Sequence, residues 1–91
     1  MNCFQYKLFN NLIYLDCSNT DLTKLNNNLV NLQYLNCSNT LIMEIPNSFI
    51  KLKILNIYNT QIDTLSSVYS ELEELYCDGS FLHNISSKLN K

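Results

Sequence analysis

The side chains best suited to chemistry in this sequence are four cysteines, one histidine and two adjacent glutamates: Cys3, Cys17, Cys37, Cys77, His83, Glu73 and Glu74. A zinc site needs four converging ligands, and the sequence has no Cys-x-x-Cys pair to start one. Glu73 and Glu74 are neighbours on an expected strand, so they point to opposite faces and cannot act together as acid and base. The single glycine leaves no glycine-rich phosphate loop. We therefore predict no catalytic residue, no cofactor and no metal site, and expect His83 to be an exposed loop residue.

Three of the cysteines recur at one spacing. Cys17 and Cys37 are twenty residues apart, Cys77 follows at the same period, and Ile57 fills the remaining place. A place that accepts cysteine or isoleucine is typical of a small apolar core position, so buried thiols are expected. The alternative is a Cys17–Cys37 disulfide, because adjacent strands bring Cα atoms within about 5 Å. Stacked side chains, however, point in parallel and not toward each other.

Composition and charge restrict the kind of protein and its partners. The 91 residues make one domain, and 46% apolar with 15% charged residues favours a folded chain. A formal charge of −2 leaves no basic stripe for phosphates, so nucleic acid is not an expected partner. No apolar run is long enough to span a membrane, and the amino-terminal stretch is interrupted by lysine and asparagine, unlike an export signal. We expect a cytoplasmic location, in the source or host cell, with no membrane partner.

A twenty-residue repeat organises the whole chain. LIYLDCSNT begins at Leu12, LQYLNCSNT at Leu32, LKILNIYNT at Leu52 and LEELYCDGS at Leu72. The predicted organisation is an irregular cap or partial repeat over 1–11, followed by four repeats at 12–31, 32–51, 52–71 and 72–91. Apolar residues recur at positions 1, 4, 6, 11, 14 and 18 of every repeat. Rows of this kind indicate units that bury their apolar sides by stacking on one another.

The spacing inside each repeat predicts its local structure. Positions 4 and 6 are two residues apart, which is the strand period, so a short strand should surround each position-4 leucine. Successive strands should be parallel, with the remaining sixteen or so residues returning the chain. That return is too short for a long helix, and its Asn- and Ser-rich composition predicts an irregular or 3₁₀ path, with Asn47 or Ser48 capping a single turn.

The pattern L-x-x-L-x-C-x-x-T-x-L resembles the leucine-rich repeat in its short, twenty-residue form. It covers residues 12–91 and is similar to repeats of bacterial effectors and of proteins from large DNA viruses and protists, so a viral or microbial source is expected. The resemblance implies an α/β solenoid, a right-handed superhelix with short parallel strands on its concave face and irregular or 3₁₀ return segments. One departure is the ninth position, where the family usually has asparagine and this chain has Thr20, Thr40, Thr60 and Ser80.

The outward strand face is the predicted binding site. Positions 3, 5 and 7 should face away from the core, and they carry tyrosines among short polar groups, which is typical of protein-binding surfaces. The alternative is that these side chains only stabilise neighbouring strands. The predicted partner-binding residues are Tyr14, Asp16, Tyr34, Asn36, Ile54, Asn56, Tyr58, Glu74, Tyr76 and Asp78.

Acidic residues gather at one end of this face. Glu73, Glu74 and Asp78 lie in the last repeat, which favours a protein partner with a basic patch, or alternatively a charged cap that keeps the end of the stack solvated. The face measures about 400 Å², half a standard interface side, so it should bind weakly alone. The predicted function is a protein–protein interaction module and not an enzyme. The alternative is a structural or self-associating solenoid without a dedicated ligand.

Overall fold

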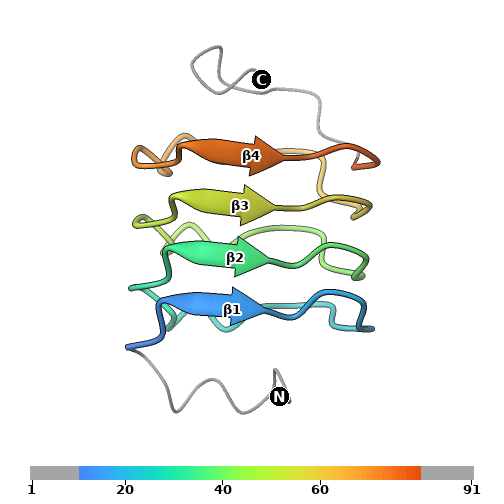
Figure 1. Cartoon of the computed structure of the whole chain (residues 1–91), viewed down its shortest axis with the longest axis horizontal. Coiled ribbons are helices and arrows are strands. Elements are labelled where there is room, and N and C mark those ends of the chain that lie inside the picture. The colour runs from blue at the N-terminus through green and yellow to red at the C-terminus, as the bar shows by residue number, and fades with distance from the viewer. Residues whose placement is uncertain (1–10, 81–91) are drawn as a thin grey trace.

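The computed structural model describes residues 11–80 and contains four short strands (Figure 1). These are β1 (Tyr14–Asp16), β2 (Tyr34–Asn36), β3 (Ile54–Asn56) and β4 (Glu74–Tyr76). They form one parallel sheet in the order β1-β2-β3-β4, as the repeat predicted. The cap, Cys3, His83 and the end of the fourth repeat lie outside the described residues.

Each strand pairs with its neighbour at an offset of one repeat. Leu15 lies opposite Leu35, which lies opposite Leu55, and Leu55 lies opposite Leu75. Backbone pairing continues past the strand ends, because the amide of each position-6 residue donates to the position-5 carbonyl of the next repeat at 2.8–3.0 Å. The amides at position 8 donate in the same way to the next repeat's position-7 carbonyls. Equivalent residues therefore lie side by side along the sheet.

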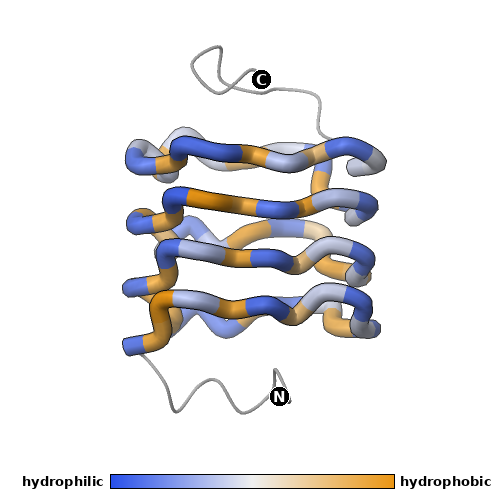
Figure 2. The backbone as a smooth tube through the Cα atoms, in the orientation of Figure 1, coloured by the Kyte–Doolittle hydropathy of each residue, from blue (hydrophilic) through white to orange (hydrophobic). Residues whose placement is uncertain are grey.

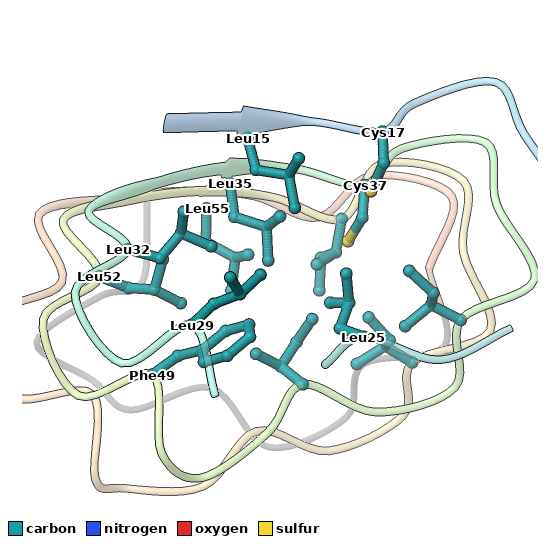
Figure 3. Packing of buried hydrophobic residues seen from close by; sticks show 14 of the residues in the cluster. Leu15, Cys17, Leu25, Leu29, Leu32, Leu35, Cys37, Phe49, Leu52 and Leu55 are labelled. Carbon is teal, nitrogen blue, oxygen red and sulfur yellow. The ribbon is translucent and has the colours of Figure 1, made fainter. Parts of the chain in front are cut away.

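Apolar residues recur along the stacked repeats (Figure 2), and their side chains pack between the strands and the returning segments (Figure 3). The position-4 leucines are buried in all four strands, and Cys17, Cys37 and Ile57 are buried in the position-6 row. Leu12, Leu65 and Cys77 are only partly buried against this core. The predicted inward positions are confirmed, and the structure shows a repeated arrangement of parallel strands over one continuous apolar core.

The returning segments contain no helix within residues 11–80, so the irregular path expected for them is confirmed, whereas the 3₁₀ alternative and the α part of the expected fold class are not found there. Tight turns replace them: the amide of Phe49 donates to the Pro46 carbonyl at 3.3 Å, and that of Leu52 to the Phe49 carbonyl at 3.3 Å. Ser48, one of the two expected caps, instead links two repeats: its hydroxyl donates to the Asn27 carbonyl of the preceding repeat at 2.7 Å. Polar side chains thus form hydrogen bonds with backbone groups that would be bonded to one another in a helix.

A left-handed residue follows every strand at position 8. Asn19, Asn39 and Asn59 have φ between 54° and 59°, and Gly79 has φ of 74°. Asparagine and glycine are the residues that adopt this conformation most readily. A Cβ atom on Gly79 would lie 3.3 Å from the Asn59 backbone, so close packing also favours glycine there. The exchange of Asn for Gly at one repeat position was a sequence signal for this turn.

Hydroxyls at position 9 complete the same turn. The Thr40 hydroxyl donates to the Cys37 carbonyl at 2.7 Å and accepts from the Ile42 amide at 3.4 Å. Thr20 and Thr60 make the same pair of bonds, and the Ser80 hydroxyl donates to the Cys77 carbonyl at 2.6 Å. These bonds stay within one repeat and do not bridge adjacent loops.

Replacing Thr40 by valine should lower the free energy of unfolding by about 1–3 kcal/mol, because it keeps the shape and leaves the buried Cys37 carbonyl without its donor. Thr20→Val is a matched control, since Thr20 makes the same bonds but is exposed, and water can replace its hydroxyl. Urea unfolding of both variants measures the difference. Equal losses of unfolding free energy in the two variants would mean that the stabilisation by the hydroxyl does not depend on its burial.

Candidate functional site

The outer strand face, defined here as positions 3, 5 and 7 of the four repeats, brings all ten predicted partner-binding residues onto one surface. Cross-strand pairing places Tyr14, Tyr34, Ile54 and Glu74 in one row, and Asp16, Asn36, Asn56 and Tyr76 in a second. Tyr14, Tyr58 and Tyr76 are 58%, 49% and 51% exposed. Ser38, at position 7, is buried, so the expectation that every position-7 side chain faces outward is wrong at that residue.

Two of the tyrosines stack across neighbouring strands. The rings of Tyr14 and Tyr34 lie 4.2 Å apart between centroids and 4° from parallel. Burial, with the neighbouring Tyr14, raises the pKa of the Tyr34 hydroxyl. Such aromatic pairs stabilise adjacent strands by about 0.5–1.5 kcal/mol beyond their buried area. Tyr34 therefore has a structural role in addition to any contact it makes with a partner.

The polar residues at position 5 fix the turn after each strand. Asp16 Oδ1 accepts from the Ser18 amide at 3.0 Å and from the Ser18 hydroxyl at 2.6 Å. Asn36 Oδ1 accepts the same two bonds from Ser38, at 3.1 and 2.7 Å, and Asn56 Oδ1 accepts from the Tyr58 amide at 2.9 Å. A side-chain oxygen that accepts two residues ahead is an Asx turn, which a short acid or amide forms readily. The repeat pattern predicted these residues only as binding residues, and their role in the turn was not predicted.

A shallow hollow of about 560 Å³ opens beside β4. Its lining residues combine aromatic, acidic and apolar groups: Tyr58, Glu74, Leu75, Tyr76, Cys77 and Asp78. The Tyr76 hydroxyl donates to Glu74 Oε1 at 2.5 Å, and this bond, together with the glutamate charge, raises the pKa of Tyr76. The sequence predicted the outward-facing members of this set. Leu75 and Cys77 occupy predicted core positions and also line the hollow.

Charge is distributed unevenly around the described surface. Asp16, Glu74 and Asp78 lie on the outer strand face, whereas no lysine of residues 11–80 does. Lys24, Lys51 and Lys53 occupy positions 13, 20 and 2 of their repeats, and Lys51 Nζ donates to Asn31 Oδ1 at 2.9 Å. The outer strand face is therefore acidic and aromatic.

The cysteines in the described part of the chain are free thiols. Cys17 and Cys37 are buried, as predicted, and Cys77 is partly exposed at the hollow. Burial raises the pKa of the Cys37 thiol to about 12 and also raises that of Cys77, where Asp78 adds to the effect. Since the thiolate is the reactive form, these positions are poor nucleophiles. Between residues 11 and 80, no three His, Cys, Asp or Glu side chains are grouped to hold a metal ion.

Comparison with known proteins finds no family model and no curated protein that matches this sequence. Across residues 11–80 the structure has no helix of the length and apolar character needed to cross a membrane.

Proposed function

We propose that this chain is a protein-interaction module of the leucine-rich-repeat kind, a right-handed solenoid that binds a partner protein through its outer strand face. The single observation that carries the proposal is the exposure of three tyrosines, Tyr14, Tyr58 and Tyr76, on the outer strand face, while the position-4 leucines of the same repeats are buried. Tyrosine supplies a large, rigid contact area at low entropic cost, together with a hydroxyl for hydrogen bonding.

The fixed register supports the solenoid part of the proposal. Parallel strands repeat at an offset of twenty residues, and their connections return behind the sheet (Figure 1). This is the arrangement that the L-x-x-L-x-C-x-x-T-x-L pattern implies. A rigid sheet holds the tyrosines at fixed spacings, so a partner does not have to order them on binding.

Self-association is the second candidate. Val30 and Ile50 occupy position 19 of adjacent repeats and are 42% and 50% exposed, so they form a small apolar strip away from the tyrosines. Light scattering over a range of concentrations separates the two functions. A monomer at high concentration favours the binding module, whereas a concentration-dependent dimer that Ile50→Ser disrupts favours self-association.

The direct test is quantitative capture of protein partners by immobilised wild type and by a Tyr14→Ala, Tyr34→Ala, Tyr58→Ala triple variant. A true partner should bind the triple variant at least about tenfold more weakly, because aromatic anchors contribute most of the energy of an interface. The matched control is Val30→Ala, Leu41→Ala, Val68→Ala, three exposed apolar residues away from this face. Thermal unfolding shows whether each variant is folded. Capture reduced equally in both folded variants, or in neither, would refute binding through the tyrosines.

A further inference from the structure

The hollow beside β4 has the chemistry of a cation site. Tyr58 and Tyr76 line the hollow, and both are about half exposed, so part of each aromatic side chain is open to a ligand. Glu74 and Asp78 contribute carboxylates to the same lining. A cation near the face of a tyrosine is attracted by the ring, and a neighbouring carboxylate adds a charge-assisted hydrogen bond.

The Glu74 carboxylate and the backbone of Asp78 are held in place before any ligand arrives. The Tyr76 hydroxyl donates to Glu74, which fixes that carboxylate beside the ring. The backbone carbonyl of Asp78 accepts from the Asn59 amide at 2.9 Å, and this bond ties its turn to the preceding repeat. An organised set of acceptors costs less entropy on binding than a flexible one.

Other occupants fit this hollow less well. An anion would be repelled by Glu74 and Asp78, and an apolar side chain would remove water from two carboxylates without replacing their hydrogen bonds. The lysines of residues 11–80 lie off this face: Lys24 and Lys53 are at positions 13 and 2, and Lys51 bonds Asn31. A cation brought by a partner would complement the two carboxylates.

We infer that this hollow receives an arginine side chain from an extended, basic segment of the partner protein. A planar guanidinium can stack on a tyrosine ring while it donates to Glu74 and Asp78, and a lysine ammonium fulfils only part of this geometry. The inference rests on the proposed function and specifies its partner: a chain with arginine at the position that meets the last described repeat.

The test uses a short peptide of alternating arginine and glycine, with matched peptides that carry lysine or the neutral isostere citrulline in place of arginine. Titration is followed by the ring resonances of Tyr58 and Tyr76 in the full chain. The arginine peptide should shift both resonances, and the citrulline peptide should bind about tenfold more weakly or not at all. The lysine peptide should be intermediate. Equal binding of the arginine and citrulline peptides, or shifts confined to Tyr14 and Tyr34, would overturn the inference.

Variants separate a local site from general charge attraction. Glu74→Gln with Asp78→Asn should weaken arginine-peptide binding about fivefold. Asp63→Asn with Glu71→Gln removes the same net charge from exposed residues off this face and should leave binding nearly unchanged. Equal weakening by both pairs would refute a local site. The citrulline comparison needs no variant, so it holds even if a substitution perturbs folding.

The two proposals fail in different ways. Partner capture that depends on the tyrosines, together with equal binding of arginine and citrulline peptides, would leave the proposed function standing and remove the cation site. Capture that is unaffected by the triple tyrosine variant would refute the proposed function, whichever peptide binds.

Discussion

Replacing Phe49 by alanine should lower the free energy of unfolding by about 3–5 kcal/mol, the range for deleting a large buried aromatic side chain. Phe49 is fully buried at position 18, on the returning segment, where it packs under the leucines of the strands near Leu29 and Leu52 (Figure 3). The neighbouring repeats place Leu29 and Tyr69 at the same position, and both are buried. The substitution would therefore leave a cavity in the middle of the apolar row.

The loss should affect more than one repeat. A repeated structure is stabilised by contacts between neighbours, so a gap in the second repeat weakens its packing on the first and the third. The total stability expected for a chain of this size is about 5–14 kcal/mol, so the variant would lose a large fraction of it. Tyr69 does not compensate, because its hydroxyl is bonded to the Ile45 and Pro46 carbonyls at 2.7 and 2.8 Å.

Ile50→Ala is the matched control, since Ile50 is the next residue in the chain and is half exposed. Its effect should stay within about 0.5 kcal/mol, as for most surface substitutions. Urea unfolding followed by far-ultraviolet circular dichroism measures both variants. Similar unfolding midpoints for Phe49→Ala and Ile50→Ala would mean that position 18 does not belong to the core.

The repeat pattern alone was enough to predict the parallel register, because its period fixes which residues can be neighbours. Leu15, Leu35 and Leu55 had to align once each repeat made one turn, and they do. The outward placement of Tyr14 and Tyr76 followed from the strand period of two. The repeat period indicates which side of the chain each residue faces. In this protein that information is enough to predict the sheet, the core and most residues of the candidate site.

Interactions that depend on side-chain chemistry within a turn could not be predicted in the same way. The Asx turns of Asp16 and Asn36 depend on local hydrogen bonds and not on the period. Position in the stack matters as well. Thr20 is exposed and Thr40 is buried at the same repeat position, since β2 has a paired neighbour on both sides and β1 has one among the described strands.

The hollow could not be predicted from the sequence, because it also depends on how side chains are arranged. Glu74, Tyr76 and Asp78 were predicted to share a face, but the bond from Tyr76 to Glu74 and the opening beside Leu75 depend on side-chain conformations. The pattern predicted which residues gather at that end of the sheet. Only the structure shows that two tyrosines and two acidic residues line one hollow.

Alkaline pH should destabilise the protein through Cys37, whose thiol has its pKa raised by burial from 9.0 to about 12. Because the folded pKa is higher than the unfolded one, the unfolded chain loses this proton first as pH rises. The contribution to stability is fully present below about pH 9 and is lost progressively as pH rises toward 12. A difference of three units between the folded and unfolded pKa values corresponds to a loss of about 4 kcal/mol in the free energy of unfolding at the upper end of that window.

Cys37→Ala should therefore flatten the decline in unfolding free energy between about pH 9 and 12, even though the smaller side chain lowers stability at neutral pH. The slope, and not the absolute value, is the relevant measurement, and urea unfolding at a series of pH values provides it. Cys77→Ala is the control: its thiol is partly exposed, so most of the decline should remain. The same slope in wild type and Cys37→Ala would show that Cys37 ionises as easily in the folded chain as in the unfolded one, which its complete burial in the position-6 row rules out.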